Sequence, residues 1–79
     1  MKITIEEFKK KFSMAIEDDA INELGNNSNF KDLESWDSFS GMSIISMIDE
    51  EFGVTIKTDE MSKINSLNEL YDLISSKLN

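Results

Sequence analysis

Apolar residues recur at helical spacing in three separate stretches of this chain, and this pattern constrains the fold most. The first stretch follows Thr4, the second follows Asp37 and the third follows Ser66. Side chains three and four positions apart lie on one face of an α-helix, so each stretch would bury a single apolar stripe. The sequence also has no proline and only three glycines, which favours helices over a turn-rich β architecture. We therefore expect an all-α fold.

Capping signals mark the first and last of these helices. Thr4 followed by Glu7, and Ser66 followed by Glu69, each have the spacing of a capping box, in which two side chains satisfy the free N–H groups of a helix start. The apolar residues that follow the first box are Ile5, Phe8, Phe12, Ala15 and Ile16, and those that follow the second are Leu67, Leu70, Tyr71, Ile74 and Leu78.

The middle of the chain predicts a long loop followed by a second helix. Residues 18–36 lack helical periodicity, and we expect a loop held to the core by its scattered apolar side chains, Ile21, Leu24, Phe30 and Leu33. Asp37 or Ser38 can cap the second helix, which would run to about Phe52 and stop at Gly53. A short helical turn is expected over residues 58–62.

The composition excludes several classes of function. Sixteen acidic residues against eight lysines leave a net charge of -8, which disfavours nucleic acid and favours basic protein partners. The absence of cysteine and histidine excludes disulfides, thiolate nucleophiles, the usual zinc ligands and an imidazole base. No metal site and no catalytic residue are expected.

The length and hydropathy of the chain predict a small single domain over residues 1–79. No apolar stretch is long enough for a membrane span, and the N-terminal region lacks the continuous apolar core of a signal peptide. We therefore expect a monomeric cytoplasmic protein without a membrane partner.

The second helix has two contrasting faces. At about 100° per residue, its core face would hold Ile44, Ile45, Ile48 and Phe52. The opposite face would expose apolar, small polar and acidic side chains, a combination that suits binding to a partner protein. These residues are Phe39, Met42, Ser43, Ser46, Asp49 and Glu50. From residue 32 to residue 56 there are six acidic residues and no basic one. The alternative is an ordinary solvated face, with Phe39 or Met42 folded back under the long loop.

Ser38 is the candidate functional residue because it lies where the long loop meets the second helix. The positive end of the helix dipole and free backbone N–H groups there would tolerate a phosphodiester. The small, weakly helix-forming residues that follow, Ser40, Gly41, Ser43 and Ser46, would let another protein approach closely, while tertiary packing would equally explain Gly41. The simpler interpretation of Asp37 and Ser38 is that they only cap the helix.

The residues around Ser38 resemble the acyl carrier protein family. The resemblance rests on Asp37-Ser38-Phe39, with apolar residues on either side of it and the stretch Asp49-Glu50-Glu51-Phe52-Gly53-Val54 downstream; those apolar residues are Leu33, Ile44, Ile45, Ile48 and Ile56. Asp-Ser-hydrophobe is a weak motif alone, but at this distance before Glu-Glu-Phe-Gly-Val it is strong. The order of the predicted elements extends the likeness to nearly the whole chain.

By this resemblance the fold is a four-helix bundle with a long first loop and a short third helix, of the stand-alone type. Ser38 is expected to be esterified with 4'-phosphopantetheine from coenzyme A by a Mg²⁺-dependent phosphopantetheinyl transferase, with Asp37 supporting that reaction. The arm would carry acyl or aminoacyl thioesters, loaded by an activating ligase and unloaded by a downstream acyltransferase or synthase. The exposed set on the second helix then corresponds to the surface with which the family meets its enzymes, and the chain itself is not an enzyme.

This sequence also departs from the usual fatty-acid carriers. Trp36 replaces a common glycine, Phe39 replaces leucine, and Ser43 and Ser46 replace acidic and bulky apolar residues of the docking face. The Trp36-Asp37-Ser38 form together with Gly41-Met42 resembles carriers dedicated to special pathways, such as aminoacyl or short-acyl transfer onto sugars or secondary metabolites.

Two other functions remain open from the residues alone. An acidic helical adaptor would bind basic partners with the same face and without a covalent arm. An enzyme using the carboxylates of Asp49 and Glu50 is less favoured, because both lie on an exposed helix with no indication of a pocket. A calcium site is disfavoured because no loop places oxygen ligands at EF-hand spacing.

Overall fold

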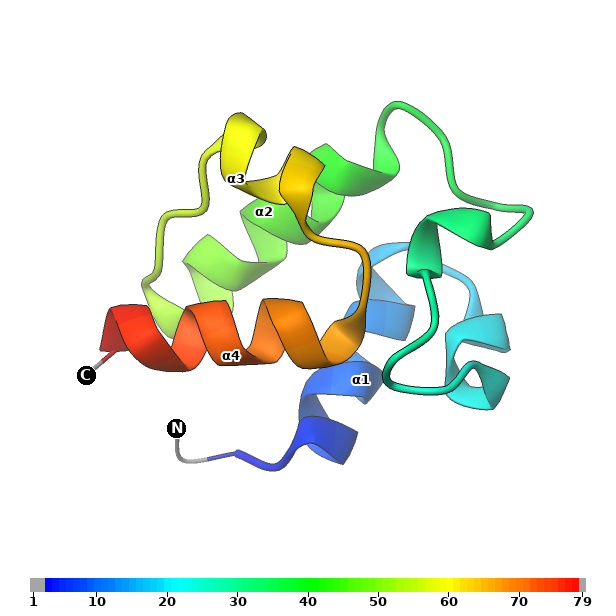
Figure 1. The fold of residues 1–79 in the computed structure, drawn as a ribbon, viewed down its shortest axis with the longest axis horizontal. Coiled ribbons are helices and arrows are strands. Elements are labelled where there is room, and N and C mark those ends of the chain that lie inside the picture. Colours follow the sequence, from blue (N-terminus) through cyan, green and yellow to red (C-terminus); the bar gives the residue numbers. More distant parts are fainter. Residues whose placement is uncertain (1–2, 79) are drawn as a thin grey trace.

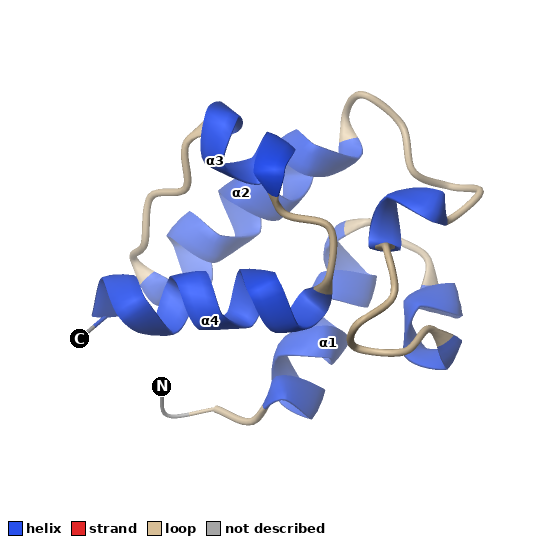
Figure 2. Ribbon diagram, in the orientation of Figure 1, coloured by secondary structure: helices blue, strands red, loops and turns tan. Residues whose placement is uncertain are grey.

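The computed structural model describes residues 3–78, and within this range every regular element is helical (Figures 1 and 2). The α-helices are α1 (Ile5–Ala15), α2 (Ser40–Phe52), the short α3 (Thr58–Lys63) and α4 (Leu67–Leu78). Two 3-10 turns, η1 (Asp19–Glu23) and η2 (Phe30–Asp32), interrupt the long connection between α1 and α2. The predicted all-α architecture with a short third helix is confirmed.

Both predicted capping boxes form. The Glu7 amide N–H donates to Thr4 Oγ1 at 3.2 Å, and the Glu7 carboxylate lies 3.5 Å from the Thr4 amide nitrogen. At the start of α4, the Glu69 amide N–H donates to Ser66 Oγ and the Ser66 amide N–H donates to Glu69 Oε1, both at 3.2 Å. Each box satisfies N–H groups that the first helical turn leaves free, which explains why α1 and α4 begin where they do.

The core consists of the apolar stripes of α1, α2 and α4 together with side chains from the loops. Residues with no more than 2% of their surface exposed are Phe8, Phe12, Ile21, Phe30, Ile44, Ile48, Ile56, Leu67, Leu70 and Ile74. Fully burying one such side chain stabilises a fold by about 1.5–3 kcal/mol. Helix α1 contacts both α2 and α4, and α3 contacts α2, so the stripes meet in the middle of the bundle.

The long connection from α1 to α2 is an ordered loop, tied to the bundle at several points. Ile21 and Phe30 are completely buried. The Phe30 amide N–H donates to the Asn65 carbonyl at 2.9 Å, and the Asn68 amide N–H donates to the Asn26 carbonyl at 3.1 Å. These bonds hold the loop against the start of α4, which Figure 1 shows at the same end of the molecule as the loop. The predicted attachment of the loop to the core is therefore observed.

Helix α2 stops at Gly53, as the sequence predicts. Gly53 has a φ of 66°, the left-handed conformation that only glycine adopts without a steric penalty, and its amide N–H donates to the Asp49 carbonyl at 2.9 Å. This bond closes the last turn of the helix and redirects the chain toward α3.

None of the helices in residues 3–78 combines the length and the apolar character that spanning a membrane requires.

Candidate functional site

Ser38 lies in an exposed turn immediately before α2. The hydrogen bonds of this turn are made by its neighbours, and within residues 3–78 no hydrogen bond involves the Ser38 hydroxyl. The hydroxyl is therefore open to solvent and is not used to hold the turn together. This geometry contradicts the interpretation of Ser38 as a capping residue.

Asp37 performs the capping instead. Its Oδ1 accepts hydrogen bonds from the amide N–H groups of Phe39 (2.9 Å) and Ser40 (3.1 Å) and from the Ser40 hydroxyl (3.2 Å). The Asp37 amide N–H in turn donates to Ser40 Oγ at 3.1 Å. Helix α2 consequently begins at Ser40, later than expected. The Phe39 and Ser40 amides therefore already have an acceptor, and any amide that faces a phosphate here would be another one of the first turn.

Trp36 anchors the chain two residues before Ser38. Its indole lies 5.1 Å from the Phe30 ring and stacks at 17° on the Phe12 ring, 6.3 Å away, by centroid distances. It also lies beside Gly41 of α2. Aromatic contacts of this kind add about 0.5–1.5 kcal/mol each beyond buried area. Ser38 is thus exposed directly after two residues that are held in place, a role for Trp36 that the sequence pattern did not indicate.

The six residues predicted for the exposed face of α2 are all solvent-exposed: Phe39, Met42, Ser43, Ser46, Asp49 and Glu50. Phe39 and Met42 leave 71% and 63% of their surfaces in water, so the alternative that either folds back under the loop is wrong. On the opposite side of α2, Ile44 and Ile48 are completely buried, whereas Ile45 and Phe52 are only half-buried.

The acidic end of this face is only partly neutralised. Glu51 pairs with Lys11 of α1, whereas within residues 3–78 neither Asp49 nor Glu50 forms an ion pair. A basic group of another protein would therefore meet unpaired carboxylates near the end of α2.

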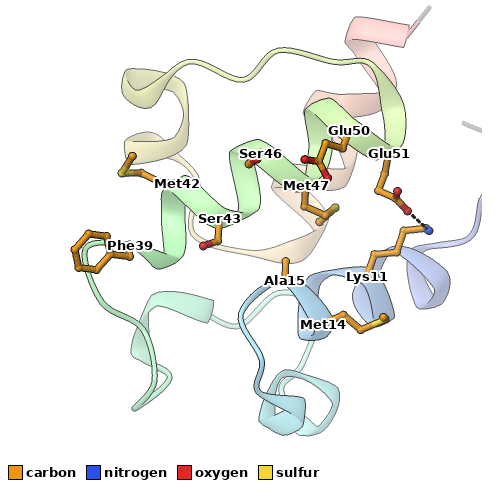
Figure 3. Close-up of a pocket in the computed structure, with 10 residues that line it drawn as sticks. All are labelled: Lys11, Met14, Ala15, Phe39, Met42, Ser43, Ser46, Met47, Glu50 and Glu51. Atoms are coloured by element: carbon orange, nitrogen blue, oxygen red, sulfur yellow. Dashed lines mark hydrogen bonds and ion pairs between the residues drawn. The ribbon is translucent and has the colours of Figure 1, made fainter.

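Two grooves border α2 on either side of this face. The first, of about 650 Å³, runs between α1 and α2 (Figure 3) and is lined by five of the six exposed residues and by five others, Lys11, Met14, Ala15, Met47 and Glu51. We call it the α1–α2 groove. The second, of about 430 Å³, lies between α2 and residues 55–58. Met42 and Ser46 line both grooves and form the ridge between them.

Comparison with known proteins identifies the family. Residues 6–74 match the family described as "Phosphopantetheine attachment site". The chain belongs to this family. Among solved structures it is similar to the holo acyl carrier protein of Geobacter metallireducens, determined by solution NMR, with a TM-score of 0.77 and 27% sequence identity over 95% of this chain and 85% of that chain. Among curated proteins, no match to the chain was found.

This protein is accordingly a carrier of covalently attached 4'-phosphopantetheine, and it serves other enzymes without being one itself. The residues present fit such a group. An exposed hydroxyl that takes no part in the hydrogen bonding of its own turn can be esterified without disturbing the fold, and the turn before α2 provides one. The predicted family, fold and cofactor are confirmed.

Proposed function

We propose that Ser38 is the residue that carries 4'-phosphopantetheine and that the chain holds acyl or aminoacyl intermediates on it as thioesters. The observation that carries the proposal is the exposed hydroxyl of Ser38, which forms no hydrogen bond within residues 3–78 and directly follows the packed indole of Trp36 and the hydrogen-bonded carboxylate of Asp37. Ser40 is nearby but is buried and hydrogen-bonded to Asp37, so its hydroxyl is less available.

The residues of this chain supply position rather than chemical activation. In this proposal the phosphopantetheinyl transferase supplies the base and the Mg²⁺, so the absence of histidine from the chain is no obstacle. Trp36 and Asp37 keep the turn in one conformation, which presents the hydroxyl to that enzyme in a fixed place. Once attached, the arm supplies a terminal thiol that forms thioesters.

The face of α2 is the proposed contact surface for the enzymes that load and unload the arm. Large apolar residues near Ser38 give way to unpaired carboxylates further along the helix. Such a surface favours weak, electrostatically steered contacts with basic partners, and these can exchange quickly. The partners implied are a phosphopantetheinyl transferase, an acyl- or aminoacyl-activating ligase, and a downstream acyltransferase or synthase.

A dedicated biosynthetic pathway, rather than general fatty-acid synthesis, is the proposed setting. Support comes from the exposed surface of α2, where Ser43 and Ser46 leave a shallow face without bulky apolar side chains at those positions. Intact mass spectrometry of the protein purified from its own cells tests this proposal, because the mass of the group on the arm identifies the acyl or aminoacyl class.

The attachment site is tested by incubating the chain with coenzyme A, Mg²⁺ and a phosphopantetheinyl transferase. We expect intact mass spectrometry to show the addition of one 4'-phosphopantetheine to the wild type and none to Ser38→Ala. Ser28→Ala is the control, since it removes an exposed hydroxyl from the long loop, outside the proposed contact surface, and should be modified normally. Modification of the Ser38→Ala variant would refute the assignment, and so would an unmodified wild type.

A further inference from the structure

Exposed apolar side chains gather around one groove of this molecule. In residues 3–78 four large apolar side chains are substantially exposed, and three of them, Met14, Phe39 and Met42, line the α1–α2 groove. Met14 belongs to α1 and leaves 71% of its surface in water. Single exposed apolar residues are ordinary on any protein surface, but a cluster that borders a hollow is typical of an interaction site.

Small side chains make the hollow between the two helices. In Figure 3, Ala15 of α1 points toward α2 beside Ser43, and both of these groove-lining side chains are small. The groove measures about 650 Å³, enough to receive a large side chain from another protein. Methionines border it on both helices, and their flexible thioether side chains adapt to differently shaped partners.

The charged residues at the groove indicate which charge a partner protein would carry beside it. Lys11 is the only basic residue that lines the groove in the described part of the chain, and it already pairs with Glu51. Glu50 is exposed, lines the groove and forms no ion pair in residues 3–78. An apolar side chain placed in the groove would therefore be accompanied most favourably by a lysine or arginine beside Glu50.

We propose that the α1–α2 groove binds a large apolar side chain of a partner protein. A basic residue next to that side chain on the partner pairs with Glu50. The proposal rests on the proposed carrier function, because the partner would be an enzyme that acts on the carried group. It adds Met14 and helix α1 to a contact surface that the sequence pattern confined to α2.

The test uses the full chain, after incubation with coenzyme A and transferase, and a short helical peptide as probe. The peptide carries one tryptophan with lysines four residues before and after it, so that all three lie on one face. With ¹³C-methyl-labelled methionine, we expect the peptide to shift the NMR signals of Met14, Met42 and Met47. Met61 is buried on another helix and serves as an internal reference whose signal should stay unchanged.

Matched variants separate the groove from the rest of the surface. Met14→Ser should weaken peptide binding about fivefold to tenfold, because it removes apolar contact area from the groove. Leu78→Ser removes the fourth exposed apolar side chain, which lies outside the groove, and should bind like the wild type. Glu50→Lys should weaken binding more than Asp72→Lys, which places the same charge on an exposed position of α4. Added salt should weaken binding to the wild type.

Several results would overturn the proposal. An unshifted Met14 signal, equal binding by Met14→Ser and Leu78→Ser, or equal binding of a peptide with alanine in place of tryptophan would each do so. The mass of the same sample reports separately on Ser38. If Ser38 is modified but the peptide does not bind in the groove, only the docking proposal is refuted. An unmodified Ser38 with a groove that binds the peptide refutes the attachment assignment alone.

Discussion

At the scale of single residues, the Asp37 side chain combines hydrogen bonding with charge, and two substitutions separate these properties. Asparagine caps helices about as well as aspartate, so Asp37→Asn should keep the three hydrogen bonds to Oδ1 and leave the free energy of unfolding nearly unchanged. Asp37→Ala removes them and should lower it by about 1 kcal/mol. Urea denaturation measures both changes.

The Asp37→Asn variant also tests whether the negative charge of Asp37 supports the transferase reaction. We expect slower modification of Ser38 in Asp37→Asn than in the wild type, measured as the initial rate of mass gain at equal Mg²⁺. Wild-type kinetics in this variant would mean that Asp37 contributes only by capping α2.

Two glycines should respond in opposite ways to the same substitution. A Cβ on Gly41 would meet Trp36 at 3.9 Å and Met61 at 4.0 Å, which are ordinary contacts, so Gly41→Ala should stabilise α2 by up to about 1 kcal/mol. Gly53 has a φ of 66°, so Gly53→Ala should destabilise the protein by about 1 kcal/mol. Thermal unfolding of both variants provides the measurement. Destabilisation by Gly41→Ala would mean that the contact with Trp36 is tighter than these distances indicate.

At the scale of elements, Glu60 links α3 to α4 through an ion pair with Lys77. Hydrogen bonds from the Lys57 amide N–H (3.0 Å) and from Lys77 of α4 (3.1 Å) lower the pKa of Glu60 below its usual 4.5. A lowered pKa in the folded state stabilises the fold above pH 4.5, and this contribution is lost as the pH falls through the lowered pKa.

The substitution Glu60→Gln should therefore lower the melting temperature slightly at pH 7, where the carboxylate is charged. Both side chains are partly exposed, so solvent screening keeps the effect small. The difference from the wild type should shrink as the pH falls below 4.5. Asp59→Gln, at the exposed neighbouring position, is the control. A difference that persists unchanged to low pH would show that the Glu60 charge is not its origin.

At the scale of the whole molecule, a net charge of -8 on 79 residues is a source of self-repulsion. Only two ion pairs form within residues 3–78, Lys11 with Glu51 and Lys77 with Glu60. Added salt or divalent cations should screen the repulsion and raise the melting temperature. For a domain of this size, each 1 kcal/mol gained in the free energy of unfolding raises the melting temperature by about 4–8 °C.

Calorimetric scans in sodium chloride and in magnesium chloride at equal ionic strength measure this effect and separate general screening from Mg²⁺ binding. A melting temperature that is indifferent to both salts would contradict the prediction and would mean that the acidic residues are spaced widely enough not to interact.

The sequence by itself determined the helices and the orientation of α2. Capping boxes at Thr4 and Ser66 act within a few residues, and the apolar period of α2 directs Ile44 and Ile48 inward and Phe39 and Met42 outward. Local hydrogen bonding and amphipathicity depend only on neighbours along the chain, so they can be recognised without coordinates.

Only the tertiary structure decided how Ser38 is held and what lies beside α2. The stacking of Trp36 on Phe12 joins residues that are far apart in the sequence, and the α1–α2 groove brings Met14 to the same surface as Phe39 and Met42. Contacts between distant segments arise from the shape of the whole core, which no local pattern specifies.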